Sequence, residues 1–588
     1  MLSSADGSTE GRYPRFGIIW YDLPGDQPGD QPEDQPEDQP EDQPEDQPGD
    51  QPGDQPGDQP EVLIASPFFE FAPLHFYHFD MKQLCLCLLL LTAALPVLAK
   101  RGPQPALRDR TELAMNRLGF GARPAEVDRV VVGGEKSLRA WIDSQLNPTA
   151  ENPKKLSLDQ SLDADLTKHQ VLTLSLEELQ AKYSKESVED DPTLKPDEIR
   201  KAWSSAKVMR AIGSQHQFQE KLVDLWFNHF NVDQRKGKLR WSFGAFERDA
   251  IRPNVFGKFQ DLLRATARHP AMLFYLDNHL NRADTKKKAG INENYARELM
   301  ELHTLGVDGG YTQGDVGEVA RILTGWSLSK DTDQSSFEFH EKQHDTASKK
   351  VMGWDFPAGQ GEAEGERLLY LLAHHPSTAK RIAKMLAENF VANPAPPALV
   401  SKLTQVYMKS GGDLKALYRT IVDSKEFWDP TWVGSRVKDH FTWTISAIRA
   451  LDGEVLWQNE LVKELNNFGE PLYQCAPPTG YTHRAEDLIN SGVLLGRLNL
   501  ALKLAANRID GVYATIPKPK AYSLKTEAQV VRYLQTQVGL SHLSNSTTEA
   551  LISELKQDSW QTSYGEVRPF VLARLTGLLL ASPEFQRL

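Results

Sequence analysis

The sequence predicts an all-α protein: a large multi-helix body with two or three closely packed helical subdomains and at most a small β-hairpin near residues 336–355. Apolar residues recur at helical spacing through most of the chain after residue 100. Gly, Pro and Asn interrupt this pattern at intervals, and strand-like alternation is scarce. The roughly 490 residues of this part exceed what one small core usually organises. We therefore expect a helical body over residues 100–588.

The segment from Asp26 to Pro60 has a composition that cannot build a core. From Asp26 to Pro60 the chain repeats Asp-Gln-Pro-Gly or Asp-Gln-Pro-Glu with a period of four. Such a segment has almost no apolar surface to bury, so we expect it to stay disordered. Our hypothesis is that residues 1–80 are a mis-assigned start and that translation begins at Met81. A genuine disordered tail is the alternative.

Residues 81–99 have the layout of a signal peptide. Lys82 is followed by an apolar run from Leu84 to Leu91, and small residues, Val97 and Ala99, stand before the expected cleavage point. We therefore expect an exported protein, periplasmic or extracellular, whose mature chain begins near Lys100. The apolar run is shorter than the ~20 residues of a spanning helix, so no permanent membrane anchor is expected.

The charge of the chain is concentrated in its first part. The whole chain has a net charge of −13, whereas residues 1–99 hold 19 Asp and Glu against 3 Lys and Arg, a balance of −16. The remaining chain is therefore near neutral, at +3, and gives no reason to expect a nucleic-acid partner. Cys475 is the only cysteine after residue 99. No intrachain disulfide is expected in the mature protein, so its core must hold it together.

The helices are expected in order along the chain. Pro124 begins the first clear one behind the Gly119–Gly121 turn, since proline suits the first helical position. The polar stretch from Ser157 to Lys195 is interpreted as a helix followed by a mobile connector near 180–196. Longer amphipathic segments follow at 196–230, 244–268, 292–305, 313–327, 365–392, 396–408, 413–427, 435–451, 487–507 and 567–581.

Two shorter signals complete this pattern. The clearest strand signal is the stretch from Ser336 to His340, where Phe337 and Phe339 fall on one side. The apolar segments Leu414–Phe427 and Val571–Phe585 both end with Ser, one residue, then Glu-Phe. We interpret this as a shared helix-ending device in which the serine caps the turn that follows.

Several segments resemble the large exported bacterial family called domain of unknown function 1800. The similarity runs from about Arg108 to Leu588, and the 292–326 block is the most specific part. It implies export and a mainly helical fold and supplies no activity, cofactor or catalytic residue. Members are often encoded beside exported sulfatase-like or phosphatase-like proteins, which implies such a partner. The segments are RTELAMNRLGFGARPAEVDRV, LWFNHFNV, ERDAIRPNVFGKFQDLLRATARHPAMLFYLDN, NENYARELMELHTLGVDGGYTQGDVGEVARILTGW, HPSTAKRIAKMLAENFV, PPTGY with NSGVLLGRLN, and SPEFQ.

The 292–326 block holds the first group of chemical candidates. Helical spacing places Arg297, Glu298 and Glu301 on one side, and two carboxylates a turn apart can hold a metal or act as acid and base. An ion-pair face is the commoner use of such residues. His303 falls roughly 140° from Glu298, so the two share an ion only if the helix breaks between them. We expect Glu298 to be partly buried and paired between helices with Arg297 or Arg321.

The second candidate is the stretch from His340 to His344, which satisfies H-E-x-x-H. In zinc hydrolases two such histidines lie one helical turn apart and hold the metal. Here the preceding phenylalanines alternate as in a strand, and the two residues between Glu341 and His344 are polar. The family resemblance matches His344, Asp345 and Lys350 to a His-Asp followed by a Lys, and it has no counterpart for His340. We therefore interpret the match as chance.

The third candidate is His229, which stands among aromatic residues in LWFNHFNV. A histidine in such a setting can be a base, a metal ligand or a sugar-contacting group. A core histidine hydrogen-bonded to a neighbouring backbone group is the commoner arrangement, and we favour it. No phosphate-binding loop, nucleophile elbow or dinucleotide fingerprint is present in the sequence.

Two functions from different classes follow. In the first, the protein is a non-catalytic cell-envelope module that binds an envelope polymer or an exported partner, and we favour this function. In the second, it is a metal-dependent hydrolase with a divalent ion held by histidines and glutamates from separate helices. The sequence identifies no cofactor. The candidates of the second function, whose convergence around a cavity would favour it, are His229, Glu298, Glu301, His303, His340 and His344.

Overall fold

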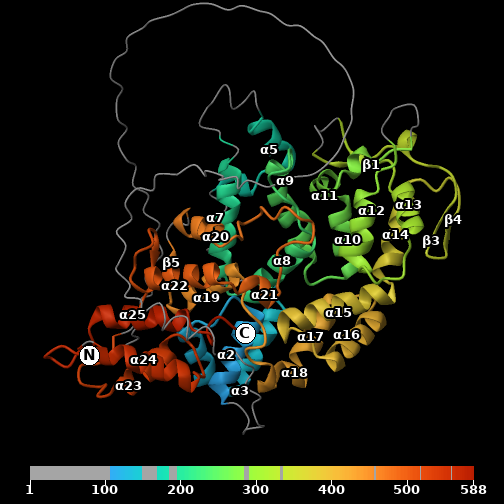
Figure 1. Ribbon diagram of the computed structural model, residues 1–588. Coiled ribbons are helices and arrows are strands. Elements are labelled where there is room, and N and C mark those ends of the chain that lie inside the picture. Colours follow the sequence, from blue (N-terminus) through green and yellow to red (C-terminus); the bar gives the residue numbers. More distant parts are fainter. Residues whose placement is uncertain are drawn as a thin grey trace, which may run out of the picture. The chain divides into compact units, whose positions relative to one another are not determined.

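The computed structural model describes residues 106–148, 169–184, 195, 197–283, 290–330, 335–455, 459–516, 518–557 and 559–588. All of them belong to one compact unit, Leu84–Leu588. The disordered leader expected at 1–80 and the signal peptide expected at 81–99 lie outside the described residues. Most of the connector expected near 180–196 also lies outside them. Helices dominate the described part of the chain, which confirms the all-α prediction (Figure 1).

The chain begins with two packed helices, α2 (Leu107–Leu118) and α3 (Pro124–Leu146). The expected start at Pro124 is confirmed. Gly134, with φ of +73°, kinks α3 in its middle. Both helices also pack against α8 (Gln217–His229), which places the beginning of the chain beside the centre of the unit.

The next segment holds η1 (Gln170–Leu172), α5 (Leu176–Lys182) and α7 (Asp197–Gly213) ahead of α8. The single helix expected at 196–230 is two helices. The side-chain amide of Gln217 donates to the carbonyls of Ala211 and Ser214, at 3.0 and 2.9 Å. It thereby satisfies two backbone acceptors near the end of α7, and the chain turns there into α8.

The helix expected at 244–268 is also interrupted. It consists of α9 (Leu239–Ala245), the π-helical η2 (Phe246–Ile251), η3 (Arg252–Asn254) and α10 (Phe259–Arg268). Pro253 lacks the amide that would continue the hydrogen-bond ladder. The segment then continues through α11 (Pro270–Tyr275) and η4 (Asn278–Leu280).

The strands form three small antiparallel ladders, and two of them lie near the expected hairpin. The expected strand Phe337–Phe339 (β2) pairs back to β1 (Trp326–Leu328), with Trp326 opposite Phe339. A separate hairpin joins β3 (Lys349–Val351) to β4 (Trp354–Phe356). Its turn residues, Met352 and Gly353, both have positive φ, which suits the twist of a two-residue hairpin turn. The third ladder, β5 (Glu454–Val455) with β6 (Val512–Tyr513), was not expected.

The block at 292–326 is a helix that widens into a π-turn. It runs from α12 (Asn294–Glu298) into the π-helical η5 (Leu299–Thr304) and continues, after a turn, as α13 (Gln313–Ile322). A capping box begins α13: Thr312 Oγ1 accepts from the amide of Asp315 at 3.2 Å, and the Asp315 carboxylate accepts from the amide of Thr312 at 2.8 Å. The short turn η6 (Glu341–Gln343) follows β2.

Helices of the middle and C-terminal parts complete the unit. In the middle part, three helices pack in succession: α15 (Pro376–Phe390), α16 (Pro397–Ser410) and α17 (Leu414–Val422) (Figure 1). In the C-terminal part, α22 lies along α25, where a Cβ at Gly577 would be 2.7 Å from Leu502. The sequence did not predict α20, α23 or α24. The helices are α14 (Glu362–Ala373), α15 (Pro376–Phe390), α16 (Pro397–Ser410), α17 (Leu414–Val422), α18 (Lys425–Trp428), η7 (Pro430–Trp432), α19 (His440–Ala450), α20 (Asn459–Asn467), α21 (Ala485–Leu488), α22 (Ser491–Ala505), α23 (Glu527–Gln537), α24 (Asn545–Gln557) and α25 (Pro569–Leu580).

The serine device at the ends of two apolar helices is confirmed. Ser424 Oγ accepts from the amide of Phe427 at 3.2 Å, and Ser582 Oγ accepts from that of Phe585 at 3.3 Å.

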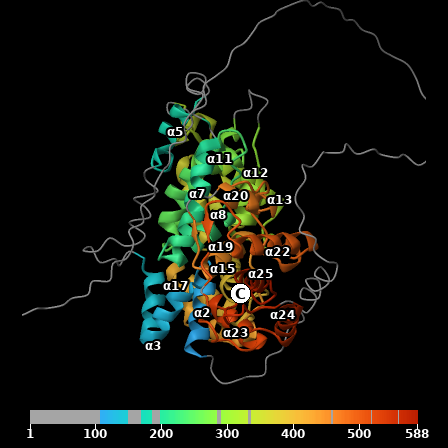
Figure 2. The ribbon, with the colours of Figure 1, turned by 90° about the vertical axis from the view of Figure 1, so that its left-hand side faces the viewer.

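Buried apolar side chains from the described helices form one contiguous core. Within it, α7 packs against α8, α19 and α20, and these helices lie together in both views (Figures 1 and 2). None of the helices in the described ranges is both long and apolar enough to span a bilayer.

Candidate functional site

The end of α8 connects two distant parts of the chain. Asn228 and Asn231 face the segment 468–484, which joins α20 to α21, whereas His229 faces η5 in the 292–326 block. Neighbouring side chains of one helix end therefore hold two segments that lie far from it in the sequence.

The two asparagines fix the loop Cys475–Tyr481. Asn228 Nδ2 donates to the carbonyl of Tyr481 at 3.0 Å, and the amide of Tyr481 donates to Asn228 Oδ1 at 2.7 Å. Asn231 Nδ2 lies 2.9 Å from the carbonyls of both Cys475 and Pro477. Gly480 has a φ of +73°, and a Cβ there would lie 2.6 Å from Asn228 Oδ1. Only glycine allows this approach without moving the loop.

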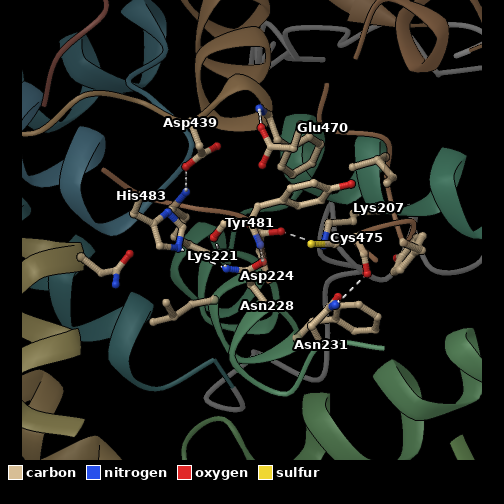
Figure 3. Close-up of a pocket in the computed structure, with 16 residues that line it drawn as sticks. Lys207, Lys221, Asp224, Asn228, Asn231, Asp439, Glu470, Cys475, Tyr481 and His483 are labelled. Atoms are coloured by element: carbon tan, nitrogen blue, oxygen red, sulfur yellow. Dashed lines mark hydrogen bonds and ion pairs between the residues drawn. The ribbon is translucent and has the colours of Figure 1, made fainter. Parts of the chain in front are cut away.

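A polar cavity opens beside this contact, between α7, α8, the start of α19 and the segment 468–484 (Figure 3). Its volume is about 40 Å³, enough for a few water-sized groups. We call it the charged pocket. Its lining residues are Lys207, Lys221, Asp224, Leu225, Phe227, Asn228, Asn231, Asn389, Asp439, Phe441, Glu470, Leu472, Tyr473, Cys475, Tyr481 and His483.

The first ion pair of the charged pocket joins α7 to α8. Lys207 Nζ lies 2.7 Å from Asp224 Oδ1. The ammonium also lies 5.2 to 5.6 Å from the ring centres of Phe227, Phe441 and Tyr473, within the range of cation–π attraction. Burial opposes its charge, but the nearby carboxylates, Asp224 first, outweigh burial and raise the pKa of Lys207. Lys207 is therefore a fixed cation.

The second ion pair joins α8 to the start of α19. Lys221 Nζ lies 3.7 Å from Asp439 Oδ2, and both side chains are buried. Asp439 also caps α19 by accepting from the amide and the hydroxyl of Thr442, at 2.6 and 2.7 Å. Burial opposes the charge of Asp439, but Lys221 and the helix-capping bonds outweigh it and hold the pKa of Asp439 well below its ordinary value. Asp439 is therefore a fixed anion.

Glu470 is the third carboxyl of the charged pocket and differs from the other two. Glu470 Oε2 accepts from the amide of Phe441 at 3.1 Å, and Glu470 forms no ion pair with any described residue. Burial, and then the charges of Asp439 and Asp224, raise the pKa of Glu470 to about 8. The carboxyl group is therefore protonated at neutral pH.

Two further groups of the charged pocket are neutral. Burial lowers the pKa of His483 to about 4. Its Nε2 lies 3.3 Å from the amide of Asn228, and its buried Nδ1 has no hydrogen-bond partner among the described residues. Burial raises the pKa of the Cys475 thiol to about 12, so this thiol is not a thiolate nucleophile at neutral pH.

The structure brings together two of the residues singled out from the sequence, His229 and His303. His229 Nε2 donates to the carbonyl of His303 at 3.1 Å, and the ring centres lie 6.2 Å apart. The rings of Trp226 and Phe230 lie 5.4 and 4.6 Å from the His229 ring centre. Burial, and then Arg381, lower the pKa of His229 to about 3. This is the backbone-bonded core histidine that the sequence favoured.

The expected pairing of Glu298 with an arginine is wrong. Arg297 pairs with Glu293 one turn back on its own helix, at 3.1 Å, and Arg321 pairs with Glu318 and Asp345, at 2.8 Å each. These closer carboxylates satisfy both arginines. Glu298 and Glu301 are half-buried without an ion pair to any described residue. Burial, and then Glu301, raise the pKa of Glu298.

The H-E-x-x-H stretch does not form the helix of a zinc hydrolase. Only Glu341–Gln343 is helical, as a single tight turn, and His344 has extended backbone. His340 Nε2 donates to the carbonyl of Leu328, and His344 Nδ1 donates to that of Thr324. The two histidines thus bond to backbone groups rather than facing one another along a helix, which agrees with our interpretation of the match as chance.

His344 instead belongs to a buried ion cluster. Its Nε2 lies 3.6 Å from Glu364 Oε2, and Lys349 Nζ lies 2.6 Å from the same oxygen. The lysine that the resemblance matched, Lys350, is exposed on the other side of β3, so Lys349 is the lysine of this cluster. Within the described ranges, no three or more His, Cys, Asp or Glu side chains are arranged to hold a metal ion.

Sequence reasoning missed the charged residues of the pocket. Lys207, Lys221 and Asp224 resemble the solvated face of amphipathic helices, and Asp439 and Glu470 resemble ordinary loop residues. The available signal was the pair of segments LWFNHFNV and PPTGY, both of which carry the family resemblance and which meet at this pocket.

Comparison with known proteins gives one match. A family described as a protein of unknown function, DUF1800, matches residues 113–587. No curated protein and no solved structure matches the chain.

Proposed function

The chain belongs to the DUF1800 family, and on that premise we propose that it is an exported, non-catalytic protein of the bacterial cell envelope that binds the end of an envelope polymer in the charged pocket. The observation that carries this proposal is the cavity itself, which two distant segments of the chain assemble and surround with ion pairs. Buried ion pairs are rarely the most stabilising way to fill an interior. Charged groups with shifted pKa values around a cavity are typical of functional sites.

The size of the charged pocket supports an end group rather than a polymer backbone. About 40 Å³ admits a few heavy atoms. The buried Nδ1 of His483 has no partner among the described residues and can serve a ligand that enters.

Export is the second part of this proposal. It rests on the signal-peptide layout of residues 81–99, which implies a periplasmic or extracellular protein. N-terminal sequencing of the native protein tests it: a mature chain beginning near Lys100 supports export, and an intact Met81 segment contradicts it.

The binding proposal is tested by co-sedimentation of the full chain with purified peptidoglycan sacculi. We expect the wild-type protein to pellet with sacculi. In Gly480→Val the new side chain meets Asn228 and displaces the loop Cys475–Tyr481, so we expect at least a tenfold loss of binding. The matched control is Gly314→Ala in α13, whose Cβ would lie an ordinary 3.5 Å from its nearest neighbour.

A soluble, folded wild-type protein that stays in the supernatant contradicts the polymer proposal. Binding instead to a purified exported sulfatase-like or phosphatase-like protein would then identify a protein partner. The other function, a metal-dependent hydrolase, requires a divalent ion at His229, Glu298, Glu301, His303 or His344. Of these residues, the structure brings His229 and His303 into contact, whereas His344 belongs to a separate cluster with Glu364.

A further inference from the structure

The charged pocket holds one more carboxyl group than cations that line it. Asp224 is paired with Lys207, and Asp439 is paired with Lys221. Glu470 shares the cavity with both pairs and has no cation of its own within ion-pair distance among the described residues. A ligand that carries a cationic group would provide Glu470 with the partner that it lacks.

The groups that face Glu470 come from several elements. Lys207 on α7 and Lys221 and Asp224 on α8 line one side, and Asp439 and the neutral His483, Tyr481 and Cys475 line the other. Two further cationic side chains, Arg436 and Arg497, do not line the cavity and already form hydrogen bonds to other groups. Arg436 donates to the carbonyl of Asn389, and Arg497 donates to the carbonyl of Lys438 and bonds to the ring of His440.

The remaining lining is suited to an ammonium group. The rings of Phe441 and Tyr473 border the cavity and already lie 5.6 and 5.2 Å from the ammonium of Lys207, because aromatic faces attract cations. An ammonium group has three donors and no acceptor, and carboxylates and amide oxygens of this lining can accept from it. An anionic group would instead enter beside three carboxyl groups, where burial, and then the charges of Asp439 and Asp224, already raise the pKa of Glu470.

We propose that the charged pocket selects an end group that carries a primary amine, and that the ligand ammonium pairs with Glu470. This inference rests on the proposed polymer-binding function and names the chemistry of the ligand. The ammonium displaces the proton of Glu470, which passes to solvent, so that a carboxylic acid becomes a carboxylate and no covalent bond to the ligand forms. A –CH–NH₃⁺ unit fits a cavity of about 40 Å³.

The test compares sacculi before and after acetylation of their free amines with acetic anhydride. Acetylation removes the charge and leaves the polymer otherwise matched. We expect at least a tenfold weaker binding of the acetylated sacculi by the wild-type chain. Glu470→Gln should bind native sacculi as weakly as the wild type binds acetylated ones, whereas Glu486→Gln, an exposed carboxylate on α21, should keep the full preference.

The pH dependence gives a second readout. Because the ammonium must replace a proton, wild-type binding should strengthen by up to about tenfold per pH unit until the pH reaches the pKa of Glu470, and Glu470→Gln should lack this increase. Equal binding of native and acetylated sacculi overturns the amine inference and leaves the polymer proposal intact. If the wild-type chain binds neither native nor acetylated sacculi, both the amine inference and the polymer proposal are overturned. If Glu470→Gln still binds native sacculi more tightly than acetylated ones, the role of Glu470 is overturned.

Discussion

The charged pocket and the His344 cluster both bury ion pairs, and the pairs of the pocket line a cavity. In the His344 cluster, the Lys349 and Glu364 side chains are 0% and 1% exposed and pair at 2.6 Å. In the pocket, Lys207 and Asp224 are 12% and 25% exposed and border a cavity. The comparison teaches that buried charge by itself marks a structural contact. A binding site additionally needs a cavity and an ionisable group that has no partner of opposite charge.

The largest effect is expected where the cluster is broken. Glu364→Gln leaves the ammonium of Lys349 buried without a carboxylate, so we expect a loss of about 3–5 kcal/mol in the free energy of unfolding. Denaturant unfolding measures it. Glu460→Gln, whose pair with Lys463 is largely exposed, is the control and should change stability by ~0–1 kcal/mol. Equal effects of the two substitutions would show that the cluster is not a structural contact.

Helices were the part of the fold that the sequence predicted well. The segments expected at 396–408 and 567–581 appear as Pro397–Ser410 and Pro569–Leu580, because apolar spacing within one helix is local information. The break between α7 and α8 was missed because the side chain of Gln217 stabilises it through contacts that spacing does not encode. The partner of Phe337–Phe339 was missed for the same reason, since strand pairing joins separate segments.

Only the uncharged residues of the candidate site could be predicted from the sequence. Asn228, Asn231 and Gly480 stand in segments that carry the family resemblance, so their importance could be read from the sequence. The charged residues could not, because Lys207 and Asp439 are 232 positions apart and nothing local distinguishes them from solvated residues. The block with the highest density of candidate groups, 292–326, instead supplies the backbone carbonyl of His303, to which His229 donates, and ordinary ion pairs.

A second prediction concerns the pH dependence of stability and sharpens the difference between the two regions. The ordinary pKa of glutamate is about 4.3, and that of Glu470 in the folded protein is about 8. Between these values the folded state binds more protons than the unfolded state, so Glu470 makes the free energy of unfolding fall as the pH rises. Unfolding at pH 5 and pH 8 should show a shallower fall for Glu470→Gln than for the parent or Glu486→Gln. An unchanged slope would contradict protonation of Glu470.

A smaller effect is expected at Cys475, which lines the charged pocket but is 4% exposed. Cys475→Ser places a hydroxyl where the thiol now lies 3.8 Å from the carbonyl of Pro477, so a hydrogen bond can offset part of its burial. We expect a loss of about 1 kcal/mol on denaturant unfolding. Because the thiol is buried and protonated, iodoacetamide should label it slowly in the folded protein and readily after unfolding. Rapid labelling of the folded protein would contradict this environment.

The smallest effect is expected at Glu298, the carboxylate that the sequence placed first. Glu298 is half-buried, forms no ion pair with a described residue, and lies near the like charge of Glu301, which helps to raise its pKa. Glu298→Gln removes an unfavourable charge and breaks no pair, so the free energy of unfolding should stay within ~1 kcal/mol of the parent, on the stabilising side. Denaturant unfolding is measured together with the metal content of both proteins, and Glu486→Gln again serves as the control. A large loss of stability would show that Glu298 has a partner that the structure does not give it. A bound divalent ion in the parent that disappears in Glu298→Gln would move the function from the charged pocket to the 292–326 block, because that loss would identify Glu298 as a ligand of the ion.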